Sequence, residues 1–184
     1  MKIVFGLGNP EQQYDGTRHN VGFAVLDEYA DKNGVSFQTK EKFHADVAEF
    51  TISGEKVLLV KPATYYNLVG QSLRAIADFY KVEPEDILVV HDDLALPFGT
   101  VRTRIGGSDA GNNGIKSVNQ HGMEQTNRVR IGIATEQRAL LDDSDFVLAK
   151  FTAEERKVLS VIQQKIAELV DDFLAGNFDH ATHR

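Results

Sequence analysis

The sequence predicts an α/β protein: a single layered domain with a twisted mixed β-sheet flanked by helices. Short apolar segments typical of buried strands alternate along the chain with longer segments whose apolar residues recur at helical spacing. Two of the strand-like segments are separated only by a short polar turn, which indicates a hairpin and hence an antiparallel part of the sheet. The length of 184 residues fits one domain spanning residues 1–184.

The first half of the chain contains three predicted strands and two predicted helices. Residues 3–7 form a short buried strand, and residues 21–32 have the spacing of an amphipathic helix. Residues 47–52 and 56–60 are the two strands of the hairpin, and residues 73–80 indicate a second helix. A long loop therefore connects the first strand to the first helix.

The second half contains three more predicted strands. Residues 87–90 form the clearest buried strand, whereas residues 101–105 and 129–133 alternate in a way typical of half-exposed strands. Residues 106–114 are expected to form a flexible glycine loop, followed by a short helix that begins at about Ile115.

A long helix is predicted near the end of the chain. Thr152 is a suitable N-cap, and Glu155 three residues later completes the pattern of a capping box. Apolar residues then recur at helical spacing through Phe173, and Gly176 is expected to end the helix.

Composition excludes several classes of protein. The chain has no cysteine, so it contains no disulfide, thiolate nucleophile or cysteine-ligated metal. It has no apolar run close to the roughly 20 residues that a membrane span needs, and no signal-peptide core, so the cytoplasm is the expected compartment. A net charge of −7 argues against nucleic-acid binding over the whole surface, but basic residues are concentrated between positions 102 and 130.

Polar side chains gather just after predicted strands. In open α/β sheets, ligands bind beyond the carboxyl ends of the strands, so these positions are candidates for a functional site. The four groups are Asn9, Pro10, Tyr14, Thr17, Arg18, His19 and Asn20; Thr64, Tyr65, Tyr66 and Asn67; His91, Asp92 and Asp93; and Ser108, Asp109, Asn112 and Asn113.

These residue types are sufficient for acyl transfer to water. A histidine can take a proton from water, a carboxylate can fix the histidine tautomer, and side-chain amides can stabilise a developing oxyanion. No covalent nucleophile is required. Taken alone, each residue also has an ordinary structural interpretation, because Asn and Asp commonly form turns and a lone loop histidine is usually a surface residue.

The same segments resemble the family of bacterial-type peptidyl-tRNA hydrolases over nearly the whole chain, in both order and spacing. The matching blocks are Gly6-Leu7-Gly8-Asn9-Pro10 with Tyr14; Thr17-Arg18-His19-Asn20-Val21-Gly22; Pro62-Ala63-Thr64-Tyr65-Tyr66-Asn67 with Gly70; His91-Asp92-Asp93-Leu94 with Leu96, Pro97 and Gly99; Gly106-Gly107 with Gly111, Asn113, Gly114 and Lys116; Arg130-Ile131-Gly132-Ile133; and Phe146-Val147-Leu148 with Phe151.

The resemblance implies a phosphorylase/hydrolase-like fold and hydrolysis of the ester between a peptide and tRNA. It implies that His19 acts as general base on water, that Asp92 orients it, and that Asn9 holds the attacking water or the tetrahedral intermediate. It further implies a monomer with no cofactor and no metal. The implied substrate-binding residues are Tyr14, Tyr66, Asn67 and Asn113, and the implied contacts with tRNA phosphates are Arg104, Lys116 and Arg130.

The chain departs from the family pattern at three positions beside the candidate site. It has Glu11 where the family usually has Gly, Tyr66 where it usually has Met, and Asn112 where it usually has His. Glu11 adds a charge and a Cβ in a turn, Tyr66 adds bulk under the peptide groove, and Asn112 replaces a titratable ring with an amide. These changes bear on rate and substrate range more than on reaction type.

Three other functions are each suggested by some feature of the sequence. A dinucleotide-binding oxidoreductase is suggested by Gly6 and Gly8, but the third glycine of that fingerprint would fall on Glu11 and no helix is predicted there. The departures from the family suggest a binding protein of the same fold that has lost turnover. A hydrolase of another small ester or amide would use the same histidine and aspartate.

Overall fold

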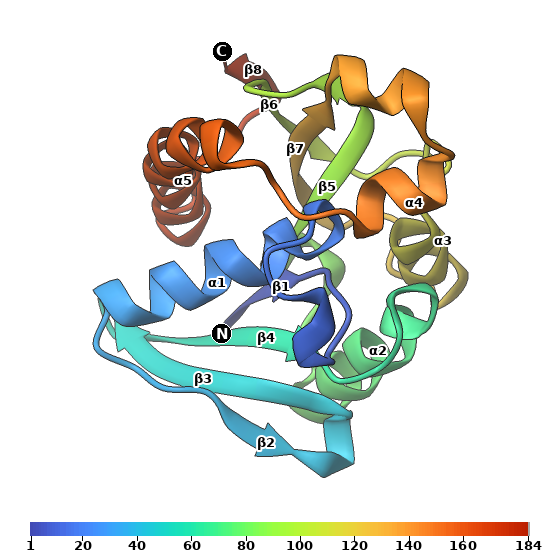
Figure 1. Ribbon diagram of the computed structural model, residues 1–184. Coiled ribbons are helices and arrows are strands. Elements are labelled where there is room, and N and C mark those ends of the chain that lie inside the picture. Colours follow the sequence, from blue (N-terminus) through green and yellow to red (C-terminus); the bar gives the residue numbers. More distant parts are fainter. Residues whose placement is uncertain (184) are drawn as a thin grey trace.

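The computed structural model describes residues 1–183, and its centre is an eight-stranded sheet within that range. The strand order is β2-β3-β4-β1-β5-β7-β6-β8 (Figure 1). The strands are β1 (Lys2–Gly6), β2 (Gln38–Lys40), β3 (Ala45–Ile52), β4 (Glu55–Pro62), β5 (Ile87–Pro97), β6 (Val101–Ile105), β7 (Asn127–Ala134) and β8 (Ala181–His183).

The sheet is mixed, as the sequence predicts. The central strands β4, β1, β5 and β7 run parallel to one another, whereas the pairs β2–β3, β3–β4, β6–β7 and β6–β8 are antiparallel. The β3–β4 hairpin turns through Ser53 and Gly54, both with positive φ (50° and 79°), which is the backbone that a two-residue turn of this twist requires. The polar spacing at this turn correctly predicted the hairpin.

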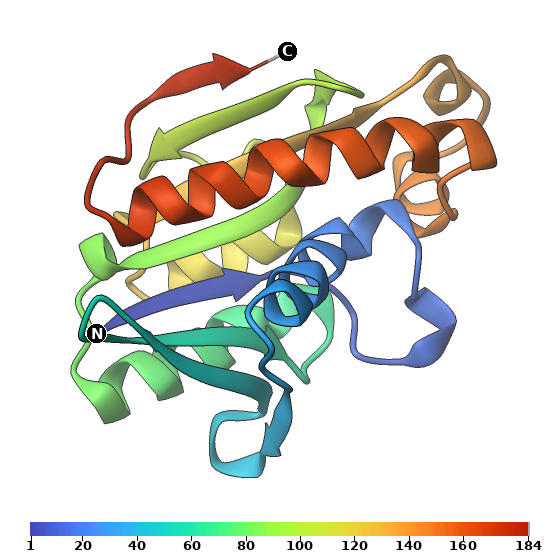
Figure 2. The same cartoon turned by 90° about the vertical axis from the view of Figure 1, so that its left-hand side faces the viewer.

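Helices cover both faces of the sheet. Helices α1 (Val21–Lys32) and α5 (Ala153–Leu174) lie together on one face, which Figure 2 turns toward the viewer. Helices α2 (Val69–Tyr80) and α3 (Asn113–Gln120) lie on the opposite face, and the short α4 (Asp143–Leu148) lies beyond the ends of the central strands (Figure 1). The structure therefore has the layered α/β architecture that the alternating pattern predicts.

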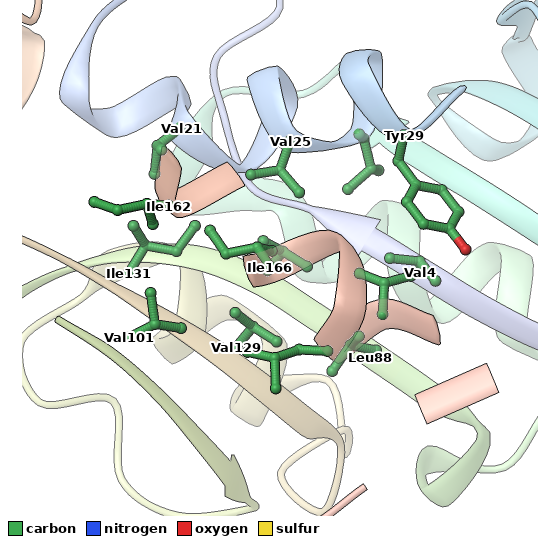
Figure 3. Packing of buried hydrophobic residues seen from close by; sticks show 14 of the residues in the cluster. Val4, Val21, Val25, Tyr29, Leu88, Val101, Val129, Ile131, Ile162 and Ile166 are labelled. Atoms are coloured by element: carbon green, nitrogen blue, oxygen red, sulfur yellow. The ribbon is translucent and has the colours of Figure 1, made fainter. Parts of the chain in front are cut away.

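Each face of the sheet has its own buried apolar cluster. On the face of α1 and α5, Val25 and Ile166 meet side chains of the central strands such as Val4 and Leu88 (Figure 3). On the face of α2 and α3, Leu73 and other apolar residues pack against the alternate side chains of the same strands. Because successive strand residues point to opposite faces, strands with helices on both sides are apolar almost throughout.

Close packing at the start of α1 places the candidate site over β5. A Cβ added at Gly22 would lie 2.5 Å from the carbonyl oxygen of Val90 and 2.7 Å from the backbone of Leu7, so any side chain here would push the helix off the sheet. The glycine lets the beginning of α1, and the residues just before it, rest directly on β1 and β5.

Some elements have other bounds than the sequence predicts, and others were not predicted. Strand β5 does not end at Val90 but continues through Pro97, and α3 begins at Asn113, two residues before the predicted start. The short elements β2, β8 and α4 were not predicted. The 3-10 helices, also unpredicted, are η1 (Gln12–Tyr14), η2 (Arg18–Asn20), η3 (Glu41–Phe43), η4 (Tyr66–Leu68), η5 (Pro84–Asp86) and η6 (Glu136–Leu140).

The capping box predicted for α5 is only half correct. Thr152 Oγ1 accepts a hydrogen bond from the Glu155 amide at 3.1 Å, as an N-cap should. The Glu155 carboxylate does not return to the backbone; it binds the guanidinium of Arg18 at 2.8 Å instead. Separately, no helix in the described part of the chain combines the length and apolarity that crossing a membrane would take.

Candidate active site

The loop after β1 and the strand β5 bring His19 and Asp92 together. His19 lies in η2 and Asp92 lies within β5, the parallel neighbour of β1. His19 Nδ1 is 2.8 Å from Asp92 Oδ2. The Asp92 side chain is only 2% exposed, whereas that of His19 is 16% exposed. A carboxylate at Nδ1 favours the tautomer with its proton there, so Nε2 is available to accept a proton.

The polar triplet of β5 lies inside the strand rather than after it, which corrects the sequence interpretation of His91 as a strand end. His91 is buried, and its Nδ1 lies 2.7 Å from the Asp92 carbonyl oxygen. Burial lowers the pKa of His91 below its ordinary value. Asp93 is also buried and pairs with Arg130 Nε at 2.8 Å. Only Asp92 of the three contacts His19.

Asn9 is fixed at the end of β1 by contacts on both its backbone and its side chain. Its amide N–H donates to Asn20 Oδ1 at 2.8 Å, and Asn20 Nδ2 donates back to the Asn9 carbonyl at 2.9 Å. Asn9 Oδ1 accepts from the Tyr66 amide at 2.9 Å. This last bond sets the orientation of the Asn9 carboxamide, so that Nδ2 is the group left to donate to a bound molecule.

Tyr66 and Asn112 are in direct contact with the His19–Asp92 pair. The Tyr66 ring stacks on the His19 imidazole with centroids 3.5 Å apart and planes inclined by 14°. The Tyr66 hydroxyl donates to Asp92 Oδ1 at 2.5 Å. Asn112 Nδ2 donates to the Tyr66 oxygen at 2.9 Å and to the Asp92 carbonyl at 3.1 Å. The Tyr66 ring therefore packs directly against the His19 ring.

Two hollows meet at His19. The first, of about 320 Å³, contains all four predicted substrate-binding side chains and is lined by Asn9, Tyr14, His19, Tyr65, Tyr66, Asn67, Asn113, Ser144, Val147 and Leu148. The second, of about 360 Å³, is lined by His19, Asp92, Asp93, Leu94, Ala95, Ala110, Gly111, Asn112, Asn113, Arg138, Asp143, Ser144 and Val147. The two hollows share His19, Asn113, Ser144 and Val147.

The predicted phosphate contacts lie on β6, β7 and α3. Lys116 is exposed on α3, and Arg104 is partly exposed on β6. Arg130, on β7, is engaged by Asp93 through its Nε, so it is less free than the sequence suggests. Arg104 and Arg130 are close enough to Arg128 for their charges to add to burial in lowering the Arg128 pKa to about 10. Arg104, Arg128 and Arg130 thus form one cluster.

Arg128 does not belong to a solvated face, which corrects one interpretation of the basic stretch. It is 2% exposed, and its guanidinium donates to the carbonyls of Gly107 and Ser108 at 3.0 and 3.1 Å and to Asn119 Oδ1 at 2.7 Å. Arg128 therefore fixes the glycine loop onto α3. Arginine is suited to this because one planar guanidinium satisfies several carbonyl groups.

The sequence placed Arg18 among the candidate polar residues but did not predict its structural role, and it did not predict α4. Arg18 is 1% exposed and binds Glu155 of α5, and it holds the turn that carries His19 against α4 through the Phe146 carbonyl at 3.3 Å. Ser144 and Val147 of α4 line both hollows. The only sequence signal for α4 was the acidic pair Asp142 and Asp143 before an apolar residue, a pattern that also fits a loop.

Glu11 causes no backbone strain. Its φ is −76° and its ψ is 141°, an extended conformation that any residue adopts, and its carboxylate accepts from the Gln13 side chain at 2.7 Å. The first α-helix after Gly8 begins only at Val21, so no helix start faces the place where a dinucleotide pyrophosphate would bind. Among residues 1–183, no three His, Cys, Asp or Glu side chains are arranged to hold a metal ion.

The comparisons with known proteins agree with this geometry. The profile of the family described as peptidyl-tRNA hydrolase matches residues 3–184. A peptidyl-tRNA hydrolase of Chlorobaculum parvum is 46% identical over 183 residues, covering 98% of this chain and 95% of that protein. One of Lactiplantibacillus plantarum is 50% identical over 156 residues, covering 84% and 83%. The crystal structure of peptidyl-tRNA hydrolase from Acinetobacter baumannii matches with a TM-score of 0.87 at 34% identity, covering 96% and 89%. The chain belongs to the peptidyl-tRNA hydrolase family of enzymes.

Proposed function

We propose that this enzyme cleaves the ester between the peptide, or an N-blocked amino acid, and the ribose of peptidyl-tRNA by direct attack of water, without a covalent intermediate. His19 Nε2 takes a proton from water, the water oxygen attacks the ester carbonyl, and the proton passes to the departing ribose oxygen. The observation that carries the proposal is the 2.8 Å contact of His19 Nδ1 with the buried Asp92 carboxylate, which leaves Nε2 on the open side.

Asn9 is proposed to hold the attacking water or the oxyanion of the tetrahedral intermediate. Its carboxamide is oriented by the Tyr66 amide, so that Nδ2 can donate. Tyr14, Tyr66, Asn67 and Asn113 are proposed to bind the peptide part of the substrate. Their support is that all four line the 320 Å³ hollow next to His19. Side-chain amides suit a peptide main chain, because each offers one acceptor and one donor group.

Arg104, Lys116 and Arg130 are proposed to contact tRNA phosphates. Their support is that they carry positive charge on neighbouring elements of a chain whose net charge is −7. We further propose that the protein acts as a monomer in the cytoplasm, where it would recycle tRNA from prematurely released chains. Sedimentation at micromolar concentration would test the monomer, since a dimer would have twice the 20.4 kDa mass of one chain.

The first test is release of the blocked amino acid from N-acetyl-aminoacyl-tRNA, with unblocked aminoacyl-tRNA run in parallel. We expect cleavage of the blocked substrate only, and its loss in His19→Ala by a factor of about 10³ or more, because the proton acceptor is gone. The variant should keep its Tm within a few degrees, since His19 is partly exposed.

His44→Asn is the matched control. His44 is an exposed histidine outside the site with φ of 49°, a conformation that Asn tolerates, so activity should not change. Full activity of His19→Ala would eliminate His19 as the base. A folded wild type that binds blocked aminoacyl-tRNA tightly without cleaving it would replace the hydrolase with a binding protein.

A further inference from the structure

Both oxygens of the Asp92 carboxylate are occupied by side chains. Oδ2 contacts His19 Nδ1 at 2.8 Å, and Oδ1 accepts the Tyr66 hydroxyl at 2.5 Å. Tyr66 also stacks face to face on the His19 ring. A single tyrosine therefore contacts both members of the pair on which the proposed reaction depends. Its slot exists because position 114 is glycine: a Cβ there would lie 2.6 Å from the Tyr66 ring.

The neighbouring Asn112 determines the direction of the tyrosine hydrogen bond. Asn112 is the N-cap of α3, and its Oδ1 accepts the Ile115 amide at 3.0 Å. This fixes the carboxamide so that Nδ2 points to the Tyr66 oxygen, at 2.9 Å. Because an amide nitrogen only donates, the Tyr66 oxygen is the acceptor in that contact. Its one proton is then directed to Asp92.

The tyrosine keeps this proton over the whole working pH range. Tyr66 is 4% exposed, and burial raises its pKa well above the usual value, with the negative charge of Asp92 adding to the effect. The hydroxyl is therefore a permanent donor to Asp92. A hydrogen bond to an ionised acceptor is also among the stronger ones in proteins.

We propose that Tyr66 and Asn112 form a two-residue positioning unit for the His19–Asp92 pair. Tyr66 holds the Asp92 carboxylate in the orientation that faces His19 and disperses part of its charge, while Asn112 directs the hydroxyl. The inference rests on the proposed function, because it assigns these residues to His19 as the base.

The Tyr66 hydrogen bond to Asp92 also affects the pH dependence of the reaction. A hydroxyl that disperses the Asp92 charge weakens the interaction of Asp92 with a positive charge on the His19 ring. Asp92 and Tyr66 contact the ring directly, and Asp93 is neutralised by Arg130. The other charged and titratable side chains that line the two hollows at the ring are Arg138, Asp143, Tyr14 and Tyr65.

The decisive variant is Tyr66→Phe, which keeps the ring stacked on His19 and removes only the hydroxyl. We expect the acidic limb of the kcat/KM profile to move to higher pH by about 0.5 to 1 unit, as the loss of one hydrogen bond to the partner carboxylate implies. On the plateau, kcat should fall by roughly tenfold with KM changed less than about twofold, because substrate contacts remain. Titration of the His19 ring protons by NMR should show the same displacement.

Tyr29→Phe is the matched control. Tyr29 is also 4% exposed, and its hydroxyl also donates to a carboxylate, Asp171, at 2.5 Å, but it lies on α1 away from the hollows. The same chemical change at the same burial should lower Tm while leaving the acidic limb and the His19 titration where they are. Any purely structural cost of losing a buried tyrosine hydroxyl is measured by this variant.

Asn112→Ser tests the coupling without disturbing the aromatic stack. Serine keeps an acceptor for the N-cap but is too short to supply the amide donor. We expect the acidic limb to rise by a few tenths of a unit in the wild-type background and not at all in Tyr66→Phe, because Asn112 acts through the hydroxyl that is missing there. Additive effects of the two substitutions would overturn the coupling.

The outcome distinguishes this inference from the proposed function. An unmoved acidic limb and an unmoved His19 titration in folded Tyr66→Phe would overturn the positioning unit while leaving the hydrolase in place. Full activity of His19→Ala would instead overturn the base, and with it the proposal built on that base. The NMR titration reads the Tyr66 effect on the imidazole without substrate, so it remains informative for variants with little activity.

Discussion

At the scale of single residues, His91 shows how β5 accommodates buried polar groups. Its ring is 4% exposed, Nδ1 lies 2.7 Å from the Asp92 carbonyl, and Nε2 has no hydrogen-bond partner within residues 1–183. Burial lowers its pKa, partly opposed by the charge of Asp93 and reinforced by that of Arg128. The strand that carries Asp92 therefore also contains a buried, neutral histidine.

His91 makes the folded state sensitive to acid. In the unfolded chain the ring takes up its proton near pH 6.5, whereas in the folded chain it does so only at lower pH. Below about pH 6.5 the unfolded state binds more protons, so stability falls as pH falls, by up to about 1.4 kcal/mol per unit. Urea unfolding of the wild type and of His91→Gln at pH 5 to 8 should show a steeper loss in the wild type.

Exposed His44 again provides the control, because His44→Asn should keep the wild-type slope. Parallel stability curves for wild type and His91→Gln would show that the buried ring does not govern acid sensitivity.

At the scale of elements, the first turn of α5 supports the loop that carries His19. Arg18 is 1% exposed and lies over the Phe146 ring of α4 at 4.2 Å. Its guanidinium donates to Glu155, to Gln137 and to the Phe146 carbonyl. An arginine buried this deeply needs the Glu155 charge, since an unpaired buried charge is strongly destabilising.

Glu155→Ala should therefore cost roughly 3 kcal/mol of unfolding free energy and also lower kcat, because the turn before His19 loses its support. Thr152→Ala, which removes only the N-cap of the same helix, should cost about 1 kcal/mol and leave kcat unchanged. Chemical denaturation and the ester assay on both variants provide the comparison. Equal costs would mean that Glu155 serves the helix end alone.

Elements with strong periodicity were predictable from the sequence, whereas polar burial was not. The first helix was predicted at the residues where it occurs, 21–32, because its apolar face is continuous. The extension of β5 could not be predicted, because a His-Asp-Asp triplet is typical of a turn. Its carboxylates can be buried in a strand only because distant residues, Tyr66 and Arg130, bind them. Strands β2 and β8 have three residues each and no apolar alternation to reveal them.

The proximity of the candidate residues was predictable, but their bonding was not. Resemblance to the family grouped His19, Asp92 and Asn9, which lie near one another in the structure. It gave no indication that Tyr66 would bind Asp92, because the usual residue there has no hydroxyl. Hydrogen-bond direction depends on which groups each amide meets in space, and the N-cap contact of Asn112 is visible only in the folded chain.

At the scale of the whole molecule, an acidic protein must bind a polyanion through a restricted surface. Binding of tRNA should weaken as salt rises, with each neutralised phosphate contributing roughly 0.7 to 0.9 to the slope of log Kd against log salt, the values for single strands and for double-helical DNA. Lys116→Ala should reduce that slope by the contribution of about one phosphate contact. Fluorescence anisotropy with uncharged tRNA would measure the slope. Lys116 is exposed on α3 beside the glycine loop.

Lys157→Ala is the matched control, since it removes the same charge from an exposed position on α5 and changes the net charge equally. Its slope should remain that of the wild type. Equal slopes for all three proteins would remove Lys116 from the tRNA surface and indicate that only overall charge matters.

The sheet is terminated at both sides by its two shortest strands, β2 and β8, each of three residues. An edge strand carries unpaired backbone donors and acceptors that can recruit an edge from another molecule, and a long flat edge is the usual starting point of aggregation. Here the outermost strands have only three residues each, and all three residues of β2 are exposed, with Lys40 at its end. The architecture that places the candidate site at the central strands thus also limits growth of the sheet from one molecule into the next.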